Sequence, residues 1–159
     1  MQQQSSPTAF LAGSRGPAST WRQDIAIPML EARNVVYYDP TDPRHSEQET
    51  EQAKATARYL VYVIDDHTRG LEEIREATQA IMAGERNVML AIEYLPYDVI
   101  IDGQRLDDHE VQSLNQARRT LWHLNETIQN TKVGRMDTIV ELMQLLIIFA
   151  HSHWSRATM

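Results

Sequence analysis

The stretch that most constrains the fold is residues 59–84, YLVYVIDDHTRGLEEIREATQAIMAG. It opens with an apolar run from Tyr59 to Ile64, rich in β-branched and aromatic side chains, which is typical of a strand buried on both faces. The residues from Asp65 to Thr68 offer turn and helix N-cap chemistry, and Gly84 is a good stop signal after a helix-length stretch. The stretch therefore predicts a strand, a polar turn and a helix.

Charged and polar side chains crowd the turn and the first turns of this helix. In an open α/β sheet, ligands bind at this place, beyond the carboxyl end of a strand and against a helix N-terminus. We therefore expect ligand-binding residues at Asp65, Thr68, Arg69 and Glu73. The guanidinium of Arg69 suits a phosphate or a carboxylate. The alternative is a salt bridge from Arg69 to Glu72, Glu73 or Glu76.

The rest of the chain alternates strands with helices. We expect further strands at 8–13, 34–38 and 87–92, helices at 19–32, 46–57, 107–129 and 137–153, a small ribbon within 98–105 and a brief strand at 132–133. Ser19 or Thr20 should cap the first of these helices, and Pro28 should kink or break it. The alternation predicts a doubly wound, flavodoxin-like parallel sheet of four to five strands in a three-layer α/β/α arrangement.

Further candidate binding residues follow the first two predicted strands. Gly13 and Ser14 begin a loop that a backbone or a ligand could approach closely. Asp39 could bond a ribose hydroxyl, although an aspartate before a proline is usually part of a turn. Trp21 could stack on a base, but packing under the sheet is the favoured role. Because the carboxyl ends of parallel strands meet at one edge, we expect Gly13, Asp39, Asp65 and Glu76 to line one pocket.

Composition narrows the classes of partner and location. The net charge of −7 argues against nucleic acid as a partner. The chain has no cysteine, which excludes disulfides and thiolate chemistry. No apolar run reaches the roughly 18 residues that span a bilayer, so we expect no membrane partner and a cytoplasmic location. Residues 1–7 predict a disordered tail, and residues 8–159 predict a single domain.

Five segments, taken together and in order, resemble the nucleoside 2-deoxyribosyltransferase-like family. They are FLAGS at 10–14, TWRQDIAIPML at 20–30, VVYYDP at 35–40, the pattern from Thr68 to Ala77, and NVMLAI at 87–92. The resemblance implies a doubly wound fold, a nucleoside or nucleotide ligand, and transfer or hydrolysis at the N-glycosidic bond through a glutamate nucleophile. Such a carboxylate attacks the anomeric carbon, holds the sugar as an ester, and releases it to a second base or to water.

The resemblance places the nucleophile at Glu76, which precedes Ala77 and stands ahead of Gly84 at the family's spacing. The helical pattern does not favour Glu76 as the nucleophile. An apolar stripe puts Glu76 close to the opposite side of the helix, where a glutamate is usually just solvated. That stripe consists of Leu71, Ile74, Thr78, Ile81 and Met82. Glu73, nearer the edge of the stripe, is the second candidate.

Three positions depart from the family pattern. Phe10 stands where the enzymes carry a tyrosine, Arg58 replaces an acidic residue, and Gly70 replaces an aspartate. Asp65 and Asp66 lie near enough in the sequence to compensate. We therefore expect little or no base exchange. The rival interpretation is a non-catalytic ligand-sensing or protein-interaction domain on the same fold.

The last predicted helix is more apolar than one packed face requires. Its stripe comprises Ile139, Leu142, Met143, Leu146, Ile147 and Ala150, and Leu145, Ile148 and Phe149 are additional. This excess favours a homo-oligomer or a place in a longer parent protein. His151 and His153 are two apart, and on a helix they do not share a face, so metal binding is not expected there. The sequence implies no cofactor.

Overall fold

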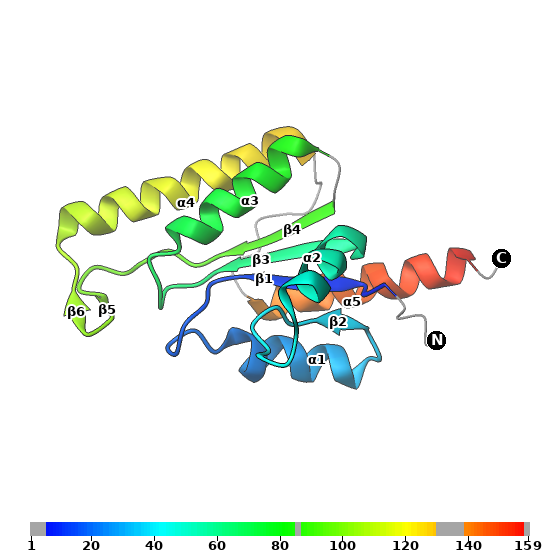
Figure 1. Ribbon diagram of the computed structural model, residues 1–159. Coiled ribbons are helices and arrows are strands. Elements are labelled where there is room, and N and C mark those ends of the chain that lie inside the picture. The colour runs from blue at the N-terminus through cyan, green and yellow to red at the C-terminus, as the bar shows by residue number, and fades with distance from the viewer. Residues whose placement is uncertain (1–5, 85–86, 130–138, 158–159) are drawn as a thin grey trace.

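The computed structural model describes residues 6–84, 87–129 and 139–157, and it has a parallel sheet between two layers of helices (Figure 1). The sheet order is β2-β1-β3-β4, with β1 at Ala9–Gly13, β2 at Tyr37–Tyr38, β3 at Tyr59–Ile64 and β4 at Asn87–Ile92. All three neighbouring pairs are parallel. This three-layer α/β/α arrangement is flavodoxin-like and confirms the predicted fold class.

Burial explains why the apolar runs become the central strands. Every residue of β1 and β3 is buried, and in β4 every residue after Asn87 is buried. Strand residues alternate between the two faces of a sheet, so a strand covered on both faces needs a continuous apolar run. The predicted bounds of β3 and β4 are confirmed for that reason. The second strand keeps only Tyr37 and Tyr38 of the predicted 34–38, because it lies at the sheet edge and pairs on one side with β1.

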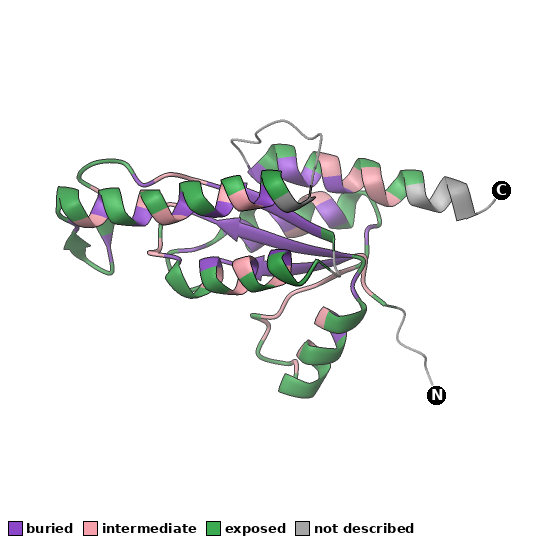
Figure 2. Cartoon of the chain, turned by 90° about the horizontal axis from the view of Figure 1, so that it is seen from above, coloured by how far each residue is buried: buried purple, intermediate pink, exposed green. Residues whose placement is uncertain are grey.

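The helices divide between the two faces of the sheet. One face carries α2 (Glu47–Thr56), α3 (Leu71–Ala83) and α4 (Asp108–Gln129), and α3 lies between the other two (Figures 1 and 2). The opposite face carries η1 (Arg22–Ala26), α1 (Ile27–Ala32) and α5 (Ile139–Ala157). Alternate residues of β3 face the two helix layers. Val61 and Val63 pack on the side of η1, α1 and α5, and Leu60, Tyr62 and Ile64 pack on the side of α2, α3 and α4.

The predicted helix at 19–32 is divided into two elements. A π-helical segment, η1, begins after Trp21, and α1 follows it with Pro28 in its first turn. A proline is tolerated there because the first amides of a helix have no intrahelical acceptor. The predicted break is therefore confirmed, but the predicted cap is wrong. Trp21 occupies the N-cap position, and the Ser19 hydroxyl donates instead to Asp65 and to the Ser14 carbonyl.

The helix α3 also begins later than the turn chemistry predicts. Its N-cap residue is Gly70, in a left-handed conformation with φ of +72°, rather than Asp65, Asp66 or Thr68. Gly84 ends the helix in the same conformation, as predicted. The predicted ribbon is present as the antiparallel pair β5 (Ile100–Ile101) and β6 (Gln104–Arg105). The predicted strand at 132–133 and the tail residues 1–5 lie outside the described residues.

Most of the apolar excess of α5 is absorbed within the chain. Leu142, Met143 and Leu146 are buried in the core that η1 and α1 share, and Leu145, Ile147 and Phe149 pack partly against it. Ile148 is 58% exposed. Within the part of the chain that the structure describes, no helix is both long and apolar enough to cross a membrane.

Candidate functional site

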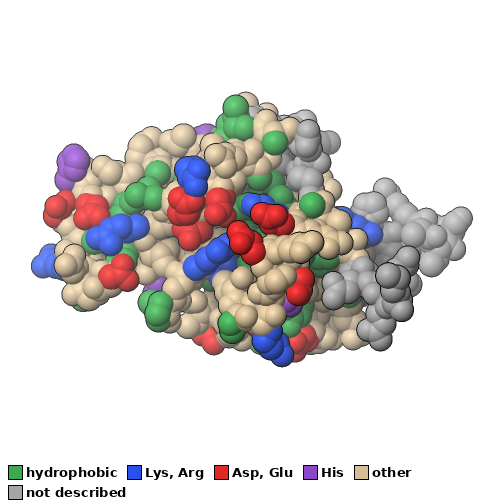
Figure 3. Space-filling model, viewed as in Figure 1, with side chains coloured by type: hydrophobic (Ala, Val, Ile, Leu, Met, Phe, Trp, Pro, Cys, Tyr) green, Lys and Arg blue, Asp and Glu red, His purple; other side chains and the backbone are tan. Residues whose placement is uncertain are grey.

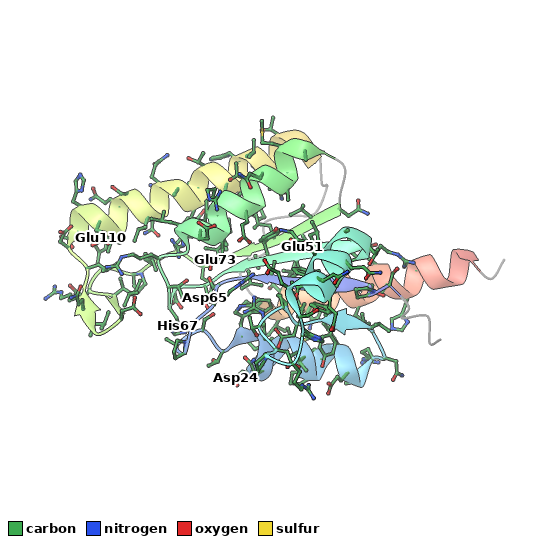
Figure 4. The ribbon with its side chains drawn as sticks, viewed as in Figure 1. Asp24, Glu51, Asp65, His67, Glu73 and Glu110 are labelled. Atoms are coloured by element: carbon green, nitrogen blue, oxygen red, sulfur yellow. The ribbon has the colours of Figure 1, made fainter. Side chains whose placement is uncertain are left out.

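The candidate site lies at the carboxyl edge of the sheet, where β1, β2 and β3 pass into loops. Asp65 and Glu73 lie near the point where β3 leads into α3, and Glu110 lies farther out at the start of α4 (Figure 4). Acidic and basic side chains are interspersed over the α2–α3 side of the molecule (Figure 3). This edge is where the fold class places ligands.

Gly13 fixes the end of β1 against β3. Its φ is +112°, and a Cβ at this position would lie 2.3 Å from the carbonyl oxygen of Val63. No side chain fits at that distance, and L residues rarely adopt that backbone conformation. The predicted close approach at Gly13 is therefore made by the neighbouring strand.

The Ser14 side chain joins the loop after β1 to the loop after β3. Its Oγ accepts a hydrogen bond from the Asp65 amide at 2.9 Å and one from the Thr68 hydroxyl at 3.0 Å. The Ser14 residue is fully buried, so these bonds are shielded from water. The structure thus brings together three of the residues that the sequence singled out.

The Ser14 carbonyl oxygen is the centre of a second set of contacts. It accepts hydrogen bonds from the Ser19 hydroxyl at 3.1 Å, Trp21 Nε1 at 3.1 Å and Arg22 Nη1 at 2.7 Å. These donors come from the segment that leads into η1 and from the first residue of η1. The loop after β1 is therefore held from inside by side chains of the following segment.

The Asp65 carboxylate is buried and engaged on both oxygens. Its Oδ1 accepts from the His67 amide at 3.1 Å and from the Thr68 hydroxyl at 3.4 Å, and its Oδ2 accepts from the Ser19 hydroxyl at 2.5 Å. Asp65 is only 1% exposed. These contacts show that Asp65 shapes the turn after β3.

Arg22 is a central residue of this edge that the sequence did not single out. It is 2% exposed, and its guanidinium donates to the carbonyl oxygens of Leu11, Gly13 and Ser14. Burial lowers the pKa of Arg22 to about 10, and the charge of Asp39, 3.7 Å away, partly offsets that effect. At neutral pH the guanidinium is therefore charged. Arg22 links the end of β1 to the loop after β2.

Arg118, on α4, is the second buried cation that the sequence did not single out. It is fully buried, and it donates to four carbonyl oxygens, those of Asp65, Thr68, Arg69 and Glu93. Burial lowers the pKa of Arg118 to about 10, against the raising effect of Asp65 and Asp66. The sequence did carry a signal, because Arg118 falls on the apolar stripe of Val111, Leu114 and Leu121.

Asp39 and Trp21 both have structural partners. Asp39 Oδ1 accepts from the backbone amide of Thr41 at 2.9 Å and from its hydroxyl at 2.6 Å, which is the turn chemistry considered for an aspartate before proline. Trp21 is 3% exposed and packs in the core under the sheet. The Arg22 guanidinium lies 4.4 Å from the centre of its ring. The favoured prediction for Trp21, packing under the sheet, is therefore confirmed.

Arg69 has different partners from those considered in the sequence. Its Nε donates to Glu110 Oε1 on α4 at 2.7 Å, and its Nη1 lies 3.7 Å from a carboxylate oxygen of Asp102. The alternative considered for Arg69, a salt bridge to Glu72, Glu73 or Glu76, is wrong. The reason is that α3 begins only at Leu71, so the Arg69 side chain lies outside the helix and reaches across to the start of α4.

The predicted apolar stripe of α3 is also wrong in part. The buried residues are Ile74, Ala77 and Ile81, whereas Leu71 is 55% exposed and Met82 is 62% exposed. The buried face is therefore rotated away from Leu71 and Met82, and Glu73 and Glu76 are both half-buried. The expectation that Glu76 faces the solvated side does not hold, because α3 is flanked by neighbours on both sides (Figure 2).

The three departures from the family pattern lie in different surroundings. Phe10 is buried and stacks on Tyr38, with ring centres 5.6 Å apart. Arg58 is exposed at the amino end of β3, the opposite end from the candidate site. At Gly70 a Cβ would lie 3.0 Å from Ile64 Cγ2 and 3.4 Å from Arg118 Nη2, and φ is positive. Glycine is therefore required at position 70 by the backbone and by the buried arginine.

A hollow opens at the same edge, beside the loops that follow β1 and β2. Its volume is about 330 Å³, and its lining residues are Gly16, Pro17, Ser19, Thr20, Arg22, Gln23, Asp24 and Thr41. This volume is at the lower end of the range for small-molecule sites. Among the described residues, no group of three acidic or histidine side chains is arranged to hold a metal ion.

The geometry at this edge is thus a rigid frame of buried hydrogen bonds beside two half-buried carboxylates on α3. None of the known protein-family models matches the chain, and no curated protein matches it.

Proposed function

We propose that the protein binds a nucleoside or nucleotide at the carboxyl edge of its sheet, with Glu76 as the carboxylate that faces the sugar. The observation that carries this proposal is the burial and the hydrogen bonding of the acidic side chains on α3. Glu73 and Glu76 are half-buried, and neither makes a hydrogen bond or ion pair within the part of the chain that the structure describes. Arg75, the nearest cation in the sequence, pairs with Glu72, and Arg69 is engaged by Glu110.

The charges around the site support the same placement. Glu73 raises the pKa values of both Arg22 and Arg118, in opposition to the larger lowering effect of burial, so its charge acts on both buried cations. Glu76 acts on Tyr62, in the middle of β3. A half-buried carboxylate with free oxygens next to a rigid frame suits either a hydroxyl donor on a sugar or attack on an anomeric carbon.

The chemical step that follows from the resemblance can be written for Glu76. Its carboxylate oxygen bonds to C1′ of the sugar while the C1′–N bond breaks, and the electron pair of that bond goes to the base, which takes up a proton. A second base or water then attacks C1′, gives up a proton to solvent and returns the carboxylate. Phe10 lacks the hydroxyl that the family supplies at this point, and loss of a positioning contact costs roughly a hundredfold in rate. We expect slow turnover.

One observation favours a second function, a ligand-sensing or interaction domain without catalysis. The predicted ligand groups of Ser14, Asp65 and Thr68 are engaged with one another. A site whose polar groups are already satisfied internally offers a shaped surface with few free donors. Binding without reaction follows if Glu76 meets the ligand but does not attack it.

The test is a thermal-shift screen against nucleosides, nucleotides and nucleotide-sugars, followed by incubation of a bound deoxynucleoside with a second free base and chromatography of the products. We expect a ligand-induced rise in the melting temperature that is lost in Glu76→Gln and kept in Glu72→Gln, an exposed neighbour. A rise that is kept in Glu76→Gln but lost in Glu73→Gln assigns the role to Glu73. Absence of any shift over the whole screen rejects the proposal.

The chromatographic arm separates the two functions. Slow exchange or hydrolysis that disappears in Glu76→Gln establishes an enzyme. Binding with unchanged deoxynucleoside establishes the non-catalytic function.

A further inference from the structure

Tyr62 occupies the middle of β3 and is fully buried. In the sheet register it lies opposite Ala12 of β1 and Leu90 of β4. Its ring packs in the cluster that α2, α3 and α4 cover, so its side chain lies on the same face of the sheet as α3. Both cross-strand neighbours are apolar, which leaves the helices above as the direction in which a polar partner can be found.

The hydroxyl of Tyr62 has no hydrogen-bond partner among the residues that the structure describes. A buried tyrosine hydroxyl almost always has one, because an unsatisfied donor in the interior costs free energy that the fold does not recover. A phenylalanine would fill the same space without that cost. Retaining the hydroxyl at this position therefore requires a partner that forms in the working protein.

Glu76 is the candidate partner, because it lies on α3 above this face of the sheet, is half-buried, and makes no hydrogen bond among the described residues. Burial and, next to it, the negative charge of Glu76 raise the pKa of Tyr62 to about 12, and the positive charge of Arg15 acts in the opposite direction. At neutral pH the hydroxyl therefore keeps its proton and is a donor. The Glu76 side chain has several torsions that set where its carboxylate points.

The neighbouring aromatic side chains on this face are less suited than Tyr62 to donate a hydrogen bond to Glu76. Phe10, on the neighbouring strand, has no polar atom on its side chain and stacks on Tyr38. The Tyr38 hydroxyl is already paired with the Thr50 hydroxyl at 2.9 Å. Tyr62 is the buried phenol of this face whose proton is still available.

We propose that Tyr62 is a positioning residue for Glu76: its buried hydroxyl donates a hydrogen bond to the Glu76 carboxylate and fixes the direction in which that carboxylate meets a bound nucleoside. This inference rests on the proposed function for its ligand, but the proposed pairing involves only residues of this chain and is tested without a ligand. A donor below the carboxylate selects one of its rotamers, and pre-organisation of this kind raises affinity and rate without a new contact to the ligand.

The pairing is tested without any ligand by ¹⁹F NMR of protein labelled with 3-fluorotyrosine. Comparison with Tyr62→Phe assigns the Tyr62 resonance. We expect Glu76→Gln to shift that resonance, and Glu72→Gln, on the exposed side of the same helix, to leave it in place. A Tyr62 resonance that is the same in wild type and Glu76→Gln overturns the proposal, whatever the ligand screen shows.

The consequence of the pairing is tested with 2′-deoxyadenosine and thymidine as probes. We expect Tyr62→Phe to melt at the wild-type temperature or above it, because an unsatisfied hydroxyl has been removed, and to lose at least tenfold in affinity or in kcat. In the Glu76→Gln background the same substitution should have no further effect. A lower melting temperature with unchanged binding, or losses that add in the double variant, would show a purely structural tyrosine. If neither probe binds, the proposed function fails and the NMR comparison alone decides the pairing.

Discussion

At the scale of single residues, two buried arginines define the candidate site more than the acidic residues do. Arg22 reaches the carbonyl oxygens at the end of β1, and Arg118 reaches those of the loops after β3 and β4. Backbone carbonyl groups in the interior must be paired. A guanidinium, with five donors in a planar fork, can pair several of them at once.

Replacement of Arg118 by methionine should therefore destabilise the fold strongly. Four carbonyl oxygens lose their donor, and each buried group left unsatisfied costs about 1–3 kcal/mol, so we expect a loss of at least about 3 kcal/mol in the free energy of unfolding. Urea denaturation followed by circular dichroism measures it. The matched control is Arg119→Met, one residue on and exposed, which donates to Gln116. We expect that control to stay within about 0.5 kcal/mol of wild type, and equal losses in the two variants would contradict the role of Arg118.

At the scale of elements, α2 shows how a local sequence signal sets a boundary. Ser46 accepts a hydrogen bond from the Glu49 amide at 3.1 Å and donates to the Glu49 carboxylate at 3.2 Å. The serine thereby caps the helix, and its side-chain bond to the acidic residue three positions on resembles a capping box. The helix has just one buried residue, Ala53, so its packing contributes little.

Ser46→Ala should lower the free energy of unfolding by about 1 kcal/mol, which corresponds to a fall of roughly 2–4 °C in the melting temperature for a chain of this size. Differential scanning calorimetry measures the shift. Gln48→Ala, an exposed change in the same turn, is the control and should leave the melting temperature nearly unchanged. A Ser46→Ala protein that melts with the wild type would mean that α2 does not depend on its cap.

The elements also show where sequence reasoning succeeds and where it stops. The runs Tyr59 to Ile64 and Asn87 to Ile92 predict their strands because burial on both faces leaves a continuous apolar pattern. The start of α3 was misplaced because Asp65 and Thr68, good capping residues, bond to Ser14 and Ser19 from a distant segment. Local chemistry cannot anticipate such partners. The buried face of α3 was misplaced for a related reason, since packing against α4 and the sheet decides which apolar residues face inward.

At the scale of the whole molecule, the expected homo-oligomer remains a prediction. Val140 and Ile148 are 40% and 58% exposed on α5, and they lie eight positions apart on a helix, close to one face. Burying an isoleucine side chain contributes on the order of 1.5–3 kcal/mol. If this face joins two copies, Ile148→Lys should weaken the dimer at least about tenfold.

Light scattering coupled to size-exclusion chromatography over a range of concentrations checks this prediction. Gln144→Lys, an exposed position between the two apolar residues, tests whether added charge alone is enough to separate the copies. A wild-type chain that stays monomeric at the highest concentration would contradict an oligomer formed through α5.

The Ser14 junction has a consequence for how a ligand is received. The Ser14 amide donates to the Val63 carbonyl at 2.7 Å, and the Asp65 amide donates to Ser14 Oγ at 2.9 Å. Loop amides usually exchange their hydrogens with solvent quickly, but we expect these two to exchange as slowly as strand amides. Ser14→Ala should speed exchange at Asp65 and leave position 14 protected. A loop that is already ordered has little entropy to lose, so affinity at this edge is governed by the contacts themselves and not by an accompanying ordering of the chain.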